Sequence, residues 1–193
     1  VELSVVCEPT VNLIEQVNRS SVDLALITHV PENGYSEIVR REPLLWVTSA
    51  NHTVHEETVL PLAFGRPTCI WRTKAIEALG NMKRDYRVLF TSWSATVISA
   101  SVLSGLAVSV MAECSLRPGM RVLGEAEGFP KLADVEIGLI RAKSRRSPIV
   151  EAMAQHVIES LDNLSSGGFG MPPADDQSPI RVRRAQSAIQ PRW

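Results

Sequence analysis

The stretch Val22-Asp-Leu-Ala-Leu-Ile-Thr-His29 decides the fold class of this chain. Its apolar run over residues 23–28 is nearly continuous, which predicts a strand buried on both faces of a sheet. Pro9-Thr10 lies upstream and opens a segment with apolar residues at helical spacing. Leu3–Cys7 precedes that segment and has the apolar composition of a further buried strand. Strand, helix and strand in this order form the repeating unit of α/β proteins.

The same alternation continues to residue 164. Further strands are expected at 38–41, 44–49, 68–71, 86–91, 106–110 and 135–141, and helices at 73–81, 94–104 and 147–164. Gly105 is expected to cap the second of these helices, and Ser147-Pro148 to begin the third. The pattern predicts an α/β fold with an open, mostly parallel sheet covered by helices on both faces.

Composition excludes several classes of protein. Of the 193 residues, 45% are hydrophobic and 21% charged, which is enough apolar material for a packed core. A net charge of −1 argues against a surface that wraps nucleic acid or coats an anionic membrane, and no apolar run is long enough to span a bilayer. Cys7, Cys69 and Cys114 show no paired spacing, which indicates a reducing compartment such as the cytoplasm.

The two ends of the chain differ from its middle. Val1 opens directly into the expected strand, without an initiator Met or a signal peptide, so we interpret the chain as N-terminally truncated. Residues 165–193 are rich in Gly, Pro and Arg and poor in branched apolar residues. We therefore expect a disordered tail there.

Motifs for catalysis are absent from the sequence. His52 and His55, with Glu56, have the spacing of a metal-binding pair on a helix, but a polar surface loop explains them better because no fuller ligand set accompanies them. Cys7 and Cys69 are expected to pack in buried strands. Glu113 is expected to raise the pKa of the neighbouring Cys114 thiol. We expect that this chain is not an enzyme and that it binds no cofactor and no metal.

Polar side chains gather where the expected strands end. Thr10 follows the first strand, Thr28-His29 the second, and Ser92-Trp93-Ser94 joins a strand to a helix. Ligands of open α/β sheets bind at such strand ends, beside helix N-termini that attract anions. Trp71-Arg72 closes another expected strand and offers an aromatic wall with a cation. Ordinary helix capping by Thr10 and Ser94, and a surface ion pair at Arg72, remain open alternatives.

Three blocks carry a resemblance to a known family. They are Val22-Asp23-Leu-Ala-Leu26, Leu44-Leu-Trp-Val-Thr-Ser-Ala-Asn-His52 and Val102-Leu-Ser-Gly-Leu-Ala-Val-Ser-Val110. In order and spacing the chain resembles the effector-binding domain of LysR-type transcriptional regulators over residues 1–164. Ala107 and Ala112 depart from the Gly and Pro that are usual in the third block.

The resemblance implies two Rossmann-like subdomains of the type II periplasmic-binding-protein fold, joined by two crossover strands. Subdomain I would hold residues 1–49 and 135–164 and would lack its first strand and helix, and subdomain II would hold residues 50–134. A small, anionic effector would bind between them, with Thr10, Thr28, His29 and the 92–94 loop at matching positions. Trp71, Arg72 and Trp93 have no fixed family role.

The resemblance also implies partners for the intact protein. DNA would bind only through an N-terminal helix-turn-helix outside this chain, and the intact protein would be a homodimer or homotetramer. The alternative is a type II periplasmic solute-binding protein, which shares the fold but serves transport. The unpaired cysteines and the three sequence blocks favour the regulator, without identifying its effector or its target genes.

Overall fold

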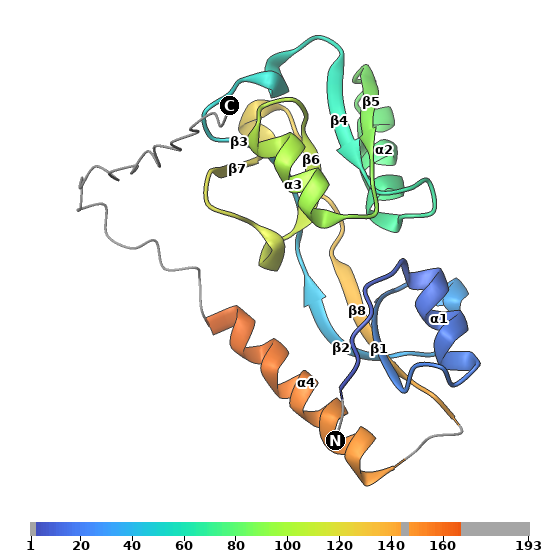
Figure 1. Cartoon of the computed structure of the whole chain (residues 1–193). Coiled ribbons are helices and arrows are strands. Elements are labelled where there is room, and N and C mark those ends of the chain that lie inside the picture. Colours follow the sequence, from blue (N-terminus) through green and yellow to red (C-terminus); the bar gives the residue numbers. More distant parts are fainter. Residues whose placement is uncertain (1–2, 144–146, 167–193) are drawn as a thin grey trace, which may run out of the picture.

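The structure is a computed structural model that describes residues 3–143 and 147–166. Its strands form two groups (Figure 1). The first group is a sheet in the order β1-β8-β2, built from β1 (Leu24–His29), β8 (Val135–Arg141) and β2 (Glu37–Glu42). Helix α1 (Thr10–Asn18) and helix α4 (Pro148–Ser166) accompany this sheet.

The second group holds the remaining strands. They are β3 (Leu44–Ser49), β4 (Leu60–Phe64), β5 (Tyr86–Thr91), β6 (Ser109–Ala112) and β7 (Met120–Leu123). Strands β6-β3-β7 pair antiparallel and β4-β5 pair parallel, and a parallel bridge between Leu62 and Val108 connects the two sets. Helices α2 (Ile70–Asn81) and α3 (Ala95–Leu103) accompany these strands.

Strands β2 and β8 carry the chain between the two groups. They pair antiparallel from Glu37 opposite Leu139 to Glu42 opposite Val135. Pro43 then separates β2 from β3, and β8 receives the chain back from the second group. Figure 1 shows these two strands leading from one group toward the other.

Each group has its own hydrophobic core. In the second group, buried Trp46 packs against Phe129 with ring centroids 5.3 Å apart, and its indole nitrogen donates a hydrogen bond to the Pro130 carbonyl. In the first group, Ala25 and Ile27 pack against Val17 of α1. Separate cores allow the two groups to act as rigid bodies with a ligand site between them.

Most of the predicted helices are confirmed. Helix α1 begins at Thr10, α2 ends at Asn81, and α3 lies within the expected range. Gly105 follows α3 with a φ of 68°, a conformation that favours glycine. At the start of α4, the Ser147 hydroxyl accepts a hydrogen bond from the Val150 amide at 3.3 Å, as expected of a capping serine.

Two predictions about the first group were wrong. Residues 3–7 form no strand, and their apolar side chains are exposed, with Val5 at 80%. A strand needs a hydrogen-bonded neighbour, and among the described residues β1 pairs with β8 alone. Strand β1 is also not buried on both faces: Leu26 is exposed while Ala25 and Ile27 are buried.

The expected strand at 68–71 was also wrong, because helix α2 begins at Ile70. The strand of this region is β4, which we had not predicted and which contains Pro61. Proline lacks an amide donor but keeps its acceptor, and the Pro61 carbonyl accepts from the Val108 amide at 2.8 Å. Strand β7 was missed as well.

The sheet is not mostly parallel. Strand β8 pairs antiparallel with both β1 and β2, and β3 pairs antiparallel with β6 and β7. Strands β2 and β8 carry the chain between the two groups in opposite directions, so they pair antiparallel, and the order of helices and strands along the sequence does not reveal this. The expected subdomain boundaries stay a prediction, although β3 pairs with strands of the second group. Residues 165 and 166 of the expected tail form the end of α4, and the rest of that tail lies outside the described residues.

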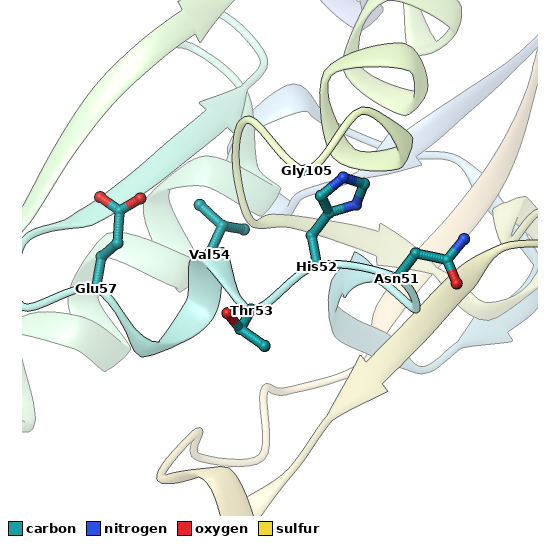
Figure 2. A pocket seen from close by; sticks show the side chains of 6 residues that line it. All are labelled: Asn51, His52, Thr53, Val54, Glu57 and Gly105. Atoms are coloured by element: carbon teal, nitrogen blue, oxygen red, sulfur yellow. The ribbon is translucent and has the colours of Figure 1, made fainter.

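We predict that Gly105→Ala destabilises the fold by at least about 2 kcal/mol, because a left-handed φ alone costs alanine about 1–2 kcal/mol. A Cβ at this position would also lie 2.2 Å from the His52 ring, which Figure 2 shows beside Gly105. Urea denaturation measures the free energy of unfolding. Gly80→Ala is the control, since a Cβ there meets nothing within 4 Å. An unchanged stability for Gly105→Ala would contradict this account.

Candidate functional site

A cavity of about 1100 Å³ lies between the two groups of strands. Its first-group wall is the segment that leads into α1 and the end of β1. Its second-group wall consists of the β4–α2 and β5–α3 connections and the segment after β6. The site therefore forms only when both groups are in place.

Three helices begin at this cavity. The first residues of α1, α2 and α3 line it, and none of these helix starts has a side-chain capping hydrogen bond. The first turn of a helix leaves amide N–H groups without partners and carries a partial positive charge. The three starts together favour an anionic group in the cavity.

The starts of α1 and α3 show whether the hydroxyl residues there act as helix caps. Pro9, not Thr10, is the N-cap of α1, so Thr10 is free of that role. Ser94 occupies the N-cap position of α3 but makes no side-chain cap. Its amide instead donates to the Ser92 hydroxyl at 3.1 Å. The capping alternative is therefore wrong for both Thr10 and Ser94.

Six of the eight predicted site residues line the cavity. They are Thr10, Thr28, Trp71, Arg72, Ser92 and Trp93. Trp71 and Arg72 reach it from the first turn of α2, not from the end of a strand as expected. Thr28 and Val30 line the cavity and His29 between them does not, which agrees with the alternation of side chains along an extended segment. His29 instead contacts the Ser36 hydroxyl at 2.8 Å, and Ser94 does not line the cavity.

Arginines give the cavity a positive balance. Arg66, Arg72 and Arg117 line it against Glu8 and Glu32. Arg72 donates to the Gly65 carbonyl at 3.2 Å, and Glu8 accepts from Asn12 at 3.0 Å. Within the described residues, no ion pair or hydrogen bond engages the side chains of Arg66 and Arg117. Two guanidinium groups are thus available for a carboxylate or a phosphate.

The sequence prediction missed Arg66 and Arg117. Arg66 lies in the connection from β4 to α2, and this connection could not be located while β4 was unrecognised. Arg117 lies between β6 and β7, in a stretch with no periodic pattern. Placing β4 at residues 60–64 would have identified Gly65-Arg66-Pro67 as a strand end.

The remaining walls of the cavity are apolar and aromatic. They include Val30, Ile70, Ile98, Val110, Met111 and Leu116. Trp93 stands at the cavity with 60% of its surface exposed. An exposed large aromatic side chain in a cavity commonly contacts a ligand. The site therefore combines cationic groups with an apolar surface for a carbon skeleton.

All three cysteines line this cavity. Cys7 is exposed and Cys69 half-buried, so neither packs in a buried strand as expected. Cys114 is exposed as a residue, but partial burial of its thiol, followed by the negative charge of Glu42, raises the pKa of that thiol. The expected direction is confirmed, but the carboxylate responsible is Glu42 and not the neighbouring Glu113.

The two histidines considered for metal binding do not share a site. His52 lines a separate small hollow (Figure 2), and its Nδ1 lies 2.9 Å from the Ser49 hydroxyl. His55 is buried, and its Nε2 lies 2.9 Å from the Arg121 guanidinium. Among the described residues, no three His, Cys, Asp or Glu side chains are placed to hold a metal ion together.

Comparison with protein families identifies the chain. The family described as LysR substrate binding domain matches residues 1–162. The chain belongs to this family. The two groups of strands with a cavity between them are thus a LysR substrate-binding domain, and the match favours the regulator over the transport protein.

Curated relatives of this LysR domain are transcriptional regulators. It is 32% identical over 162 residues to the HTH-type transcriptional regulator DgdR of Burkholderia cepacia, covering 84% of this chain and 55% of DgdR. It is 24% identical over 152 residues to PecT of Dickeya dadantii, covering 78% of this chain and 48% of PecT. The chain therefore spans about half the length of the curated relatives it matches.

Solved structures share the fold of the LysR domain. The effector-binding domain of QuiR in complex with shikimate matches with a TM-score of 0.60 at 18% identity, over 81% of this chain and 79% of that one. Vibrio fischeri DarR, solved in complex with DNA, matches with a TM-score of 0.64 at 15% identity, over 83% and 56%. These likenesses establish the type II periplasmic-binding-protein-like fold. No helix in the described part of the LysR domain has the length and apolarity needed to cross a membrane.

We predict that the thiol of Cys114 reacts with iodoacetamide at a higher pH midpoint than free cysteine does. Burial and Glu42 both disfavour the thiolate, which is the reactive form. Peptide mapping by mass spectrometry over a pH series would report Cys114 separately from Cys7 and Cys69. A midpoint at or below that of free cysteine would contradict the placement of Cys114 beside Glu42.

Proposed function

We propose that this chain is the sensing module of a LysR-type transcriptional regulator and binds a small anionic effector in the cavity between its two groups of strands. The observation that carries the proposal is the convergence of three uncapped helix starts with the unengaged arginines Arg66 and Arg117. A concave site lined by apolar groups and a few convergent polar groups is typical of small-molecule binding.

Each part of the cavity has a proposed contact with the effector. Arg66, Arg72 and Arg117 would neutralise its acidic group, because guanidinium forms paired hydrogen bonds with carboxylate and phosphate. The hydroxyls of Thr10 and Ser92, with that of Thr28, would orient polar substituents. The apolar wall and Trp71 and Trp93 would cover the carbon skeleton. The shikimate bound by QuiR, a small carboxylate, agrees with this class of ligand.

The whole protein is proposed to act as its relatives' names describe. DgdR and PecT are HTH-type transcriptional regulators, and DarR was solved with DNA. We propose that DNA binding belongs to a helix-turn-helix outside this chain, in a cytoplasmic homodimer or homotetramer. Effector binding would shift the balance between two arrangements of the domain and thereby alter DNA binding. We propose no catalytic step for the cavity.

The test begins with a ligand screen. Thermal-shift measurements of the full chain against small carboxylates and phosphates, with shikimate and neutral analogues included, should identify acids that raise the melting temperature. Neutral analogues of the same size should give no shift, because they leave the arginines without a counter-charge. A screen in which acids and neutral analogues behave alike would overturn the anionic assignment.

We predict that Arg66→Gln and Arg117→Gln each weaken binding of the best acid about 10- to 100-fold, the loss expected for a charge-assisted hydrogen bond. Isothermal titration calorimetry at fixed salt concentration measures the change. Arg87→Gln on β5 is the matched control, because Arg87 does not line the cavity and pairs with Glu57 at 3.5 Å on the surface. Equal affinities in all three variants would refute the site.

Ser92 and Ser94 provide a second matched pair. We predict that Ser92→Ala weakens the same ligand about fivefold, because a hydrogen bond to the ligand and the acceptor for the Ser94 amide are both lost. Ser94→Ala should change affinity less than twofold, since that side chain lies outside the cavity lining. The reverse order of effects would show that the loop presents Ser94 to the ligand instead.

A further inference from the structure

A carboxylate is buried where the chain passes from one group of strands to the other. Glu42 is the last residue of β2, directly before Pro43, and only 1% of its surface is exposed. A buried carboxylate is costly unless charged and hydrogen-bonding partners surround it. The partners of Glu42 therefore determine whether this carboxylate is stable at the junction between the two groups of strands.

The first partner of Glu42 is the cavity wall. Its Oε2 accepts a hydrogen bond from the Cys114 amide at 3.3 Å. The adjoining Glu113 amide donates to the Pro43 carbonyl at 3.1 Å. Cys114 begins the segment 114–118, all of which lines the cavity and which includes Arg117. Glu42 thus anchors the start of that wall to the end of β2.

The second partner of Glu42 is Arg40, two residues earlier on the same strand. The Arg40 Nε donates to the Glu42 carboxylate, and its Nη1 donates to the backbone carbonyl of Leu161 in α4. The Arg40 side chain is only 14% exposed. Separate nitrogens of one guanidinium therefore join the carboxylate to the second half of α4, a geometry that the fork of arginine allows.

A second contact holds the first half of α4. Arg141 of β8 lies 3.3 Å from the Glu151 carboxylate and 2.5 Å from that of Glu37. This contact is exposed at Glu151 and does not reach the cavity, whereas the Arg40 contact continues through Glu42 to Cys114. The path from the cavity to α4 therefore runs through Arg40.

We propose that Glu42 is a positioning residue that links the cavity wall to helix α4. Movement of segment 114–118, which carries Arg117, would shift the Cys114 amide against a carboxylate that cannot relax into solvent. Arg40 would pass this change to the Leu161 carbonyl and alter how firmly the second half of α4 is held. Coupling of this kind is reciprocal, so restraint of α4 would also restrain the cavity wall.

This proposal goes beyond effector binding and does not depend on it. The link consists of contacts within the chain, so its test needs no effector. A cavity that binds no acid would refute the proposed function and leave the link standing. A broken link would leave the effector assignment untouched.

Amide hydrogen exchange on the full chain tests the link through two variants. In Glu42→Gln, one oxygen remains for two donors, so exchange should rise about five- to tenfold both in residues 113–118 and in the second half of α4. In Arg40→Lys the ammonium group keeps the charge beside Glu42 but lacks the separate Nη1 that reaches the Leu161 carbonyl, so exchange should rise by a similar factor in α4 while 113–118 stays protected.

Glu136→Gln is the matched control. Glu136 lies on β8 and pairs with the exposed Arg41 at 2.9 Å, so this variant removes a carboxylate from the same sheet without touching the link. Its exchange in both segments should equal that of the unmodified protein. Unchanged exchange of α4 in Arg40→Lys would overturn the proposal. A rise of exchange in Glu42→Gln that is confined to residues 113–118, or to the second half of α4, would overturn it as well.

Chemical modification tests the direction from the cavity to α4, and it serves also where Glu42→Gln does not fold. Reaction of Cys114 with iodoacetamide should raise exchange in the second half of α4, and this response should disappear in Arg40→Lys. Cys114→Ser, treated identically, controls for the reaction of Cys7 and Cys69. Glu42→Gln, where it folds, should also lower the pH midpoint of the Cys114 reaction, because it removes a negative charge that raises the pKa of that thiol. No response of α4 to Cys114 modification would refute the link.

Discussion

The antiparallel pairing of β2 with β8 is the constraint on which the rest of this structure depends. These strands lie side by side from Glu37 opposite Leu139 to Glu42 opposite Val135, and both continue into the second group of strands. Backbone hydrogen bonds along this pair fix where the two groups face each other. The helix starts of α1, α2 and α3 meet at one cavity because this pair holds their groups in register.

The cavity gathers positively charged side chains although the chain as a whole has almost no net charge. The net charge is −1, yet Arg66, Arg72 and Arg117 line the site. Helix starts add partial positive charge without any charged residue, so the balance of charge around the cavity is positive although the net charge of the chain is negative. Apolar walls lower the effective dielectric constant and strengthen attraction to an anion. Composition alone would therefore give a poor guide to the ligand.

The buried pair of Glu42 and Arg40 shows how side chains at the end of β2 can link distant parts of the domain. Replacing a buried ion pair by apolar residues is often neutral or stabilising, so such a pair is weak evidence for stability. Here each member also bonds a backbone group of a distant element: the Cys114 amide in one case and the Leu161 carbonyl in the other. These long-range partners indicate that the pair positions the two backbone segments, a role separate from any contribution of the pair to the stability of the protein.

The sequence by itself determined the local elements and the family. Helical spacing located α1, α3 and α4, and the apolar run at 23–28 located β1. Thr10, Thr28 and Ser92 were predicted as site residues from expected strand ends, and they line the cavity although residues 3–9, which precede Thr10, form no strand. Tertiary structure decided what depends on distant partners. Whether residues 3–7 form a strand depends on a neighbouring strand, and whether Pro61 fits a strand depends on a partner that needs only its carbonyl. His29 and Ser94 lie outside the cavity, and Arg66 and Arg117 line it, because strand alternation and loop paths set those positions. Periodicity reports which side of an element is apolar, whereas partners far apart in the chain decide what that side meets.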